Sequence, residues 1–163
     1  MKNINDYINE ALIVEAGNRD VEEAVSAWKD FAVLTHNVNG YENNEALKYI
    51  AKNNKIEVIS LYCDKMEEGD INGIPISHKG NVRTIIPEWA QNILDNKDKK
   101  YIVLFIGISE SKDANKLYNE IMPIVINHKI NDKKCDNFII GIVDKKLNLP
   151  KPLESKLRPV IKA

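Results

Sequence analysis

Four short apolar runs are spaced along the chain and separated by amphipathic segments. Within each run apolar residues follow one another without polar alternation, which is typical of strands buried on both faces of a parallel sheet. The four predicted strands are Phe31–Thr35, Glu57–Tyr62, Tyr101–Ile108 and Phe138–Val143.

The segments between these strands have helical periodicity. They predict helices at Asn44–Lys52, near Pro87–Leu94 and at Asp113–Val125. Pro87 suits the first position of its helix, whereas Pro123 should kink or end the third helix. Strands that alternate with helices indicate βαβ units, so we expect an α/β fold: a three-layer sandwich around a mostly parallel sheet of four or five strands.

The remaining segments complete a single domain over residues 1–163, with an N-terminal helix within 1–19 and the α/β core over 20–163. Asp20 can cap a second helix with Glu23 three residues on, as in a capping box. The polar stretch Glu67–Ile86 is expected to be a long surface excursion. The tail Leu147–Ala163 has room for one short helix and a last short strand.

Composition excludes several classes of protein. The 163 residues carry a formal net charge of −1, so bulk electrostatics favour neither nucleic acid nor an anionic membrane. No apolar stretch reaches the length of a membrane span, and the N-terminus lacks a signal-peptide apolar region. Cys63 and Cys135 lack metal-type spacing and are expected to be reduced, buried thiols. A cytoplasmic location is expected.

An ordered series of short motifs runs through residues 21–161. The segment GDINGIPISHKG carries Asp70, Gly73 and Pro75, and IIPEWAQNIL carries Pro87 and Trp89. FIIGIVDKK and PLESKLRPVI follow in order. Together they resemble the MoxR-like, dynein-related branch of AAA+ ATPases. The resemblance implies a P-loop NTPase-like fold, with the first strand between the last short strand and the strand Phe138–Val143. The family's helical lid would follow residue 161, and we expect this chain to lack it.

The residues aligned with the family's phosphate-binding loop do not suit that role. Such a loop needs glycines, a lysine and a hydroxyl residue to hold phosphates and magnesium. The aligned stretch runs from Asn37 to Asn44 and retains Gly40. Glu42 stands in place of the second glycine, Asn43 in place of the lysine and Asn44 in place of the hydroxyl residue. An ordinary strand-to-helix turn, with Asn43 or Asn44 as N-cap, is the simpler interpretation.

The acidic motif and the sensor position also depart from the family. Gly107 and Ile108 stand where the family has an Asp-Glu pair for magnesium and water, and Glu110 lies two residues further on. Asp144 stands in place of the sensor asparagine, where a carboxylate would repel a γ-phosphate. We therefore expect no catalytic residues, no nucleotide or other cofactor, and no ATPase activity.

Other polar groups give weak indications of a site. His36, His78 and His128 are dispersed, whereas a metal centre or catalytic triad needs convergent ligands. The acids Asp64, Glu67, Glu68 and Asp70 could bind a cation, but loose surface acids are the simpler interpretation, and no metal is expected. Trp28 and Trp89 lie on apolar helix faces and are predicted to be core residues.

Two functional hypotheses of different classes remain. The first is a non-catalytic interaction or scaffold module that assembles with itself or regulates an active AAA+ ATPase. The resemblance implies an arginine finger at Arg158, although a solvated charge is the simpler interpretation. The second is a divergent nucleotide-binding enzyme, an ATPase or nucleotidase with a non-standard site.

Overall fold

A computed structural model of the chain describes residues 30–43, 47–48, 51–52, 55–157 and 161–162. Its centre is a parallel sheet of five strands in the order β2-β5-β8-β1-β9. The strands are β1 (Phe31–Leu34), β2 (Ile56–Tyr62), β5 (Lys100–Ile106), β8 (Phe138–Asp144) and β9 (Ile161–Lys162). Every described pairing in this sheet is parallel. The predicted parallel sheet, with the first strand between the last strand and β8, is confirmed.

One predicted strand boundary was wrong, and it affects the candidate site. The strand predicted for Tyr101–Ile108 ends at Ile106. Gly107 takes a left-handed conformation, with φ of 75°, and Ile108 begins the 3-10 turn η3 (Ile108–Glu110). An apolar run shows which residues are buried but does not show where the backbone turns. Ile108 is fully buried although it lies beyond the end of the strand.

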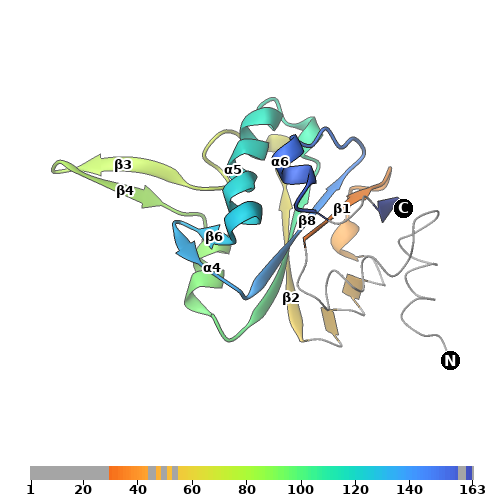
Figure 1. The fold of residues 1–163 in the computed structure, drawn as a ribbon, viewed down its shortest axis with the longest axis horizontal. Coiled ribbons are helices and arrows are strands. Elements are labelled where there is room, and N and C mark those ends of the chain that lie inside the picture. Colours follow the sequence, from red (N-terminus) through yellow and green to blue (C-terminus); the bar gives the residue numbers. More distant parts are fainter. Residues whose placement is uncertain (1–29, 44–46, 49–50, 53–54, 158–160, 163) are drawn as a thin grey trace.

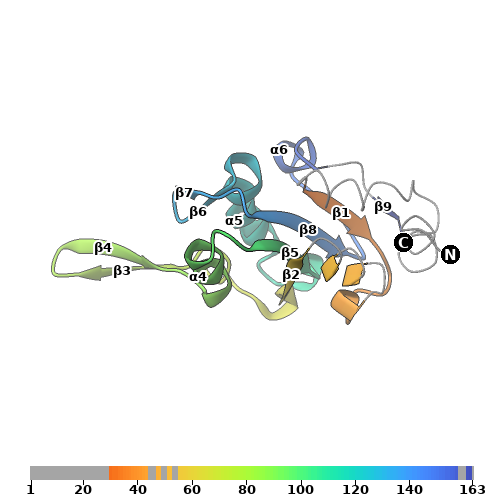
Figure 2. The same cartoon turned by 90° about the horizontal axis from the view of Figure 1, so that it is seen from below.

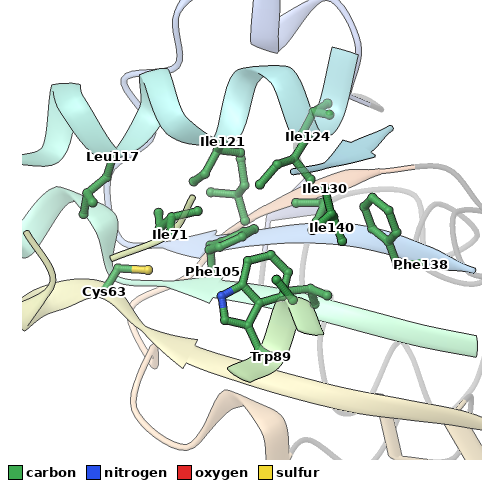
Figure 3. Close-up of a cluster of buried hydrophobic side chains, with 14 of the residues drawn as sticks. Cys63, Ile71, Trp89, Phe105, Leu117, Ile121, Ile124, Ile130, Phe138 and Ile140 are labelled. Atoms are coloured by element: carbon green, nitrogen blue, oxygen red, sulfur yellow. The ribbon is translucent and has the colours of Figure 1, made fainter. Parts of the chain in front are cut away.

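Three described helices pack on one face of the sheet: α4 (Glu88–Asp95), α5 (Ala114–Asn127) and α6 (Lys151–Glu154). Their apolar side chains join those of β5 and β8 in one core cluster, part of which is drawn in Figure 3. Trp89 meets Phe105 edge to face, with ring centroids 5.9 Å apart, so the core role predicted for Trp89 is confirmed. The helical residues 47–48 and 51–52 lie on the opposite side of the sheet from α5 (Figure 2).

The sequence analysis predicted that Pro123 would kink or end the third helix, and the helix does not end there. Helix α5 continues for one further turn, to Asn127, with Pro123 inside it. Proline removes one backbone hydrogen bond and crowds the preceding turn. Ile124 and Val125 are nevertheless buried against the sheet. We infer that this apolar packing outweighs the local cost of the proline.

The excursion between β2 and α4 is mostly a β-hairpin, which the sequence analysis did not predict. It begins with the 3-10 turn η2 (Cys63–Lys65) and continues into the antiparallel strands β3 (Ile74–His78) and β4 (Asn81–Ile85). The strands are joined by a two-residue turn in which both residues have positive φ, as in a type I′ hairpin. The hairpin, here called the arm, projects away from the sheet (Figures 1 and 2).

The base of the arm is fixed to α5. Glu120 accepts hydrogen bonds from the backbone N–H groups of Gly69 and Asn72, each at 3.1 Å. Gly73 lies so close to the other strand of the arm that an added Cβ would be 2.2 Å from the carbonyl oxygen of Ile85. The glycine at this position of the segment GDINGIPISHKG therefore has a packing reason: it lets the two sides of the arm approach each other at the base.

A second, smaller hairpin follows α5 and was also not predicted. It pairs β6 (Lys129–Ile130) with β7 (Lys133–Lys134). Asn131 and Asp132 form its turn, both with positive φ. Asn and Asp tolerate the left-handed conformation that such a turn requires, but strands of two residues are too short for a hydrophobic pattern.

Several predictions lie outside the described residues. These are the helices expected before residue 30, the N-cap at Asn44, the core role of Trp28 and the arginine finger at Arg158. The short helix and the last short strand expected in the tail are confirmed as α6 and β9.

Candidate functional site at the carboxyl edge of the sheet

The loop that follows β1 is closed by its own hydrogen bonds. The Thr35 N–H donates to the Asp144 carbonyl at 2.9 Å, which extends the pairing of β1 with β8 by one residue. The Asn43 N–H donates to the Gly40 carbonyl at 2.9 Å, within the turn η1 (Tyr41–Asn43). Tyr41 is buried, and its burial raises the pKa of the hydroxyl. A phosphate-binding loop must instead point several N–H groups outward to the ligand.

Glu42 connects this loop to the end of β2. The Tyr62 hydroxyl donates a hydrogen bond to the Glu42 carboxylate. The pKa of Tyr62 is raised, first by desolvation and then by the hydrogen bond to Glu42 and its negative charge. The Glu42 carboxylate is therefore held against the end of β2, at the carboxyl edge of the sheet.

Gly107 and Ile108, which the sequence analysis compared with an acidic motif, begin the turn after β5 and carry no carboxylate. The Gly107 N–H donates to the Val143 carbonyl at 2.9 Å, so this residue continues the contact between β5 and β8. Ile108 is fully buried in the apolar core and takes no part in the edge. The nearby Glu110 forms an ion pair with Lys145, with 2.6 Å between Oε1 and Nζ. Hydrogen bonding to Glu110 is the main cause of the raised pKa of Lys145.

Asp144 ends β8, and its side chain is fully buried. Its carboxylate accepts hydrogen bonds from the Ser109 N–H at 2.7 Å and from the Ser109 hydroxyl at 2.6 Å. The Lys145 N–H donates to the same carboxylate at 2.8 Å. These three bonds give the buried charge local partners, and they join the turn after β5 to the end of β8.

A cavity of about 260 Å³ lies among these turns. Its lining includes Val38, Asn39, Tyr62, Asp64, Glu110 and Lys145. They follow or end β1, β2, β5 and β8, so the cavity is at the carboxyl edge of the sheet, where open α/β folds bind ligands. Two carboxylates face one lysine that is already paired. The structure therefore has a cavity at the edge of the sheet where a ligand would be expected, and the lining of this cavity is acidic.

Sequence reasoning overlooked Tyr62 and Lys145 at this cavity. Tyr62 is the last residue of β2, and Lys145 directly follows β8. Because the carboxyl ends of parallel strands converge, the polar residues that end each apolar run could have been taken together as one set.

The dispersed histidines stay apart. His36 is exposed after β1, His78 belongs to the arm, and His128 follows α5. Within the described part of the chain, no group of three or more His, Cys, Asp or Glu side chains could hold a metal ion.

The acids of the excursion have local partners. Glu67 pairs with Lys112 at 2.8 Å and Glu68 pairs with Lys116 at 3.3 Å. Asp70 accepts the Glu67 N–H at 2.7 Å. These contacts, like those of Glu120, fasten the base of the arm to α5 and the turn before it.

Both cysteines are free and buried, as predicted. Burial raises the pKa of Cys63 to about 12 and also raises that of Cys135. A thiol that is difficult to ionise is a poor nucleophile.

Among the described helices, none is both long and apolar enough to cross a membrane.

The strand order defines an α/β protein with a five-stranded parallel sheet. No protein-family model and no curated protein sequence matches the chain. Its structure is similar to RuvB of Thermotoga maritima, a Holliday junction branch migration motor, with 13% identity and a TM-score of 0.49. Two variants of that protein match with 12% and 10% identity and TM-scores of 0.47 and 0.46.

The chain is shorter than these structures. The three matches cover 88%, 89% and 88% of this chain but only 41%, 43% and 42% of the others. At such identities the likeness concerns the course of the backbone.

Proposed function

We propose that this chain is a non-catalytic AAA+-like module that acts through contacts with other proteins and does not turn over nucleotide. The observation that carries the proposal is the contact between Glu42 and Tyr62 in the loop after β1. It holds the Glu42 carboxylate in the loop that the resemblance compares with a phosphate-binding loop, where a negative charge would oppose a triphosphate. Asn43, Gly107 and Ile108 lack the cationic and acidic groups that ATP hydrolysis needs.

Electrostatics support the same proposal. A triphosphate in the carboxyl-edge cavity would meet the charges of Asp64 and Glu110, and Lys145 is the one cation among the residues that line the cavity. Like charges 4 Å apart repel by about 1 kcal/mol in water and by about 4 kcal/mol in the environment typical of a protein surface. The lysine is already engaged by Glu110, so binding a phosphate there would also require breaking an ion pair.

Calorimetric titration with Mg-ATP tests the proposal directly. We expect no heat of binding and no rise in melting temperature at millimolar Mg-ATP, because only a ligand that binds the native state stabilises it. An active AAA+ protein titrated in the same buffer is the positive control. Micromolar affinity for Mg-ATP would contradict the proposal.

The partner we propose is an active AAA+ subunit, or a further copy of this chain. Arg158 supports the first choice, since the resemblance places it where an arginine finger reaches a neighbour's nucleotide. The arm supports contact with a second protein, because Val82 and Ile85 are 73% and 58% exposed on it.

Arg158→Ala tests this role in a reconstituted assembly with an AAA+ protein encoded beside this chain. We expect the partner's ATPase rate to fall at least ten-fold while assembly is unchanged. Lys156→Ala, which removes an exposed charge from the same segment, is the matched control. An unchanged ATPase rate, or no association with such a partner, would remove the arginine-finger role.

A second candidate function is a divergent ATPase or nucleotidase. The observation in its favour is the cavity of about 260 Å³ at the carboxyl edge, with two carboxylates and a lysine in reach of one another. Phosphate release from a panel of Mg-nucleotides separates the two proposals. Turnover that is lost in Glu110→Gln would support the enzyme and exclude the non-catalytic module.

A further inference from the structure

A second and larger cavity, of about 550 Å³, lies at the opposite edge of the sheet. It is bordered by the end of α4, the end of α5, the β6–β7 hairpin and the start of β8. The residues that line it are Lys97, His128, Lys134, Cys135, Asp136, Asn137 and Phe138. Phe138 marks this end of the core in Figure 3. None of these residues belongs to the carboxyl-edge cavity.

The floor of this cavity is built and held in place. The His128 ring stacks on Phe138, with centroids 4.7 Å apart and planes inclined by 22°. Its Nε2 lies 3.4 Å from Oδ2 of Asp30. The other oxygen of Asp30 accepts the buried Ile140 N–H at 2.7 Å. The imidazole is thereby fixed between β1, β8 and the end of α5.

The rim carries more positive than negative charge. Lys97 and Lys134 are exposed at the cavity, and Asp136 is the one acid among its lining residues. Asp30 beneath it is already matched by His128, and the pKa of His128 is raised chiefly by its hydrogen bond to Asp30. An anion in this cavity would therefore meet two lysines and a histidine whose protonated form is favoured.

The side chain of Asn137 has a buried oxygen that accepts no hydrogen bond from the described residues. The residue is 4% exposed, and its Nδ2 donates to the carbonyls of Ile93 at 3.1 Å and Asn96 at 3.2 Å. Those two bonds fix the orientation of the amide. Its Oδ1 then has no donor among the described residues. A buried acceptor without a donor is unfavourable, and Asn137 is one of the residues that line the cavity, so a ligand in the cavity that brought a donor to Oδ1 would relieve that cost.

We propose that this cavity binds a small organic oxyanion, a carboxylate or phosphate ester, that also carries a hydroxyl or amide donor. The oxyanion would lie between Lys97 and Lys134, and the donor would satisfy Oδ1 of Asn137. The volume of about 550 Å³ is within the range of small-molecule sites. This site is independent of the proposed partner role, because it shares no lining residue with the carboxyl edge.

Citrate and tricarballylate form a matched pair of probes, because they differ only in the hydroxyl of citrate. Each is titrated into the full chain at constant ionic strength and followed by amide chemical shifts. We expect saturable shifts centred on His128, Cys135 and Phe138, with citrate at least five-fold tighter. Equal affinities would overturn the role of Asn137. The comparison leaves the Asn137 side chain and its contacts with α4 unchanged.

Lysine variants test the position of the oxyanion. Lys97→Ala and Lys134→Ala should each weaken citrate at least five-fold, whereas Lys151→Ala, at an exposed lysine outside the cavity, should leave the affinity unchanged. Inorganic phosphate as a further probe should compete with citrate for the same amide shifts. Shifts that do not saturate, or that are the same in all three variants, would overturn the site.

Discussion

The carboxylate of Asp144 accepts two hydrogen bonds from Ser109, one from its backbone N–H at 2.7 Å and one from its hydroxyl at 2.6 Å. The two residues are 35 positions apart in the chain, at the ends of neighbouring strands. Their contact fixes the turn that contains Gly107, where the resembled family has its acidic motif. The side chain that the sequence analysis compared with a sensor asparagine is part of the internal structure of the edge.

Replacing Asp144 by asparagine should destabilise the protein. The amide keeps one acceptor oxygen, and its NH₂ group must then face the backbone N–H of Ser109 or of Lys145, so a buried hydrogen bond is lost. We expect a loss of about 1–3 kcal/mol in the free energy of unfolding, measured by urea denaturation. Ser109→Ala, which removes only the hydroxyl, should cost less. Equal stability of Asp144→Asn and the native chain would show that the buried charge contributes nothing.

Gly73→Ala and Gly80→Ala form a matched pair on the arm. Both glycines have positive φ, of 97° and 77°, so each alanine suffers backbone strain of about 1 kcal/mol. Only at Gly73 would the new Cβ also collide with the backbone, at Ile85. We therefore expect Gly73→Ala to open the arm and Gly80→Ala to leave it paired.

Amide hydrogen exchange of β3 and β4 measures the difference between the two variants. Faster exchange across the arm is expected in Gly73→Ala alone. The same exchange rates in both variants would contradict the close approach at the base of the arm.

The contact between His128 and Asp30 predicts a pH dependence of stability. The pKa of His128 is raised by the hydrogen bond to Asp30, so protonation is favoured in the folded state. The stabilisation is therefore complete below about pH 6.5, the pKa of an unfolded histidine, and is lost as the pH rises through the folded pKa. His128→Asn should remove this dependence, and asparagine tolerates the left-handed backbone found there.

Urea denaturation of both proteins between pH 5 and pH 9 gives the comparison. The native chain should lose stability relative to His128→Asn as the pH rises. Parallel curves over the whole range would show that the ion pair does not contribute.

Restoring one residue of the phosphate-binding loop should not restore ATP hydrolysis. Asn43→Lys would supply a cation, but Gly107 and Ile108 would still provide no carboxylate for magnesium or water. We expect phosphate release from Mg-ATP to stay at background. A measurable rate in this single variant would mean that Glu110 or Asp64 can replace the missing acids, and it would favour the enzymatic alternative.

The sequence by itself determined the class of fold. Runs such as Phe138–Val143 have no polar face, and a strand of that kind is stable only with cover on both sides. Helical periodicity located α4 and α5 for a similar reason, since each buries one apolar stripe. The resemblance added the strand order, which β1 shows by pairing with both β8 and β9.

Only the tertiary structure decided how the polar residues are used. Glu42 with Tyr62, Asp144 with Ser109 and His128 with Asp30 are each far apart in the chain. Hydrophobic periodicity reports burial, not the partner of a polar group, because that partner depends on which strands lie side by side. The arm and the cavity beside Asn137 escaped prediction for the same reason: a two-residue turn or a missing hydrogen bond leaves no repeating pattern in the sequence.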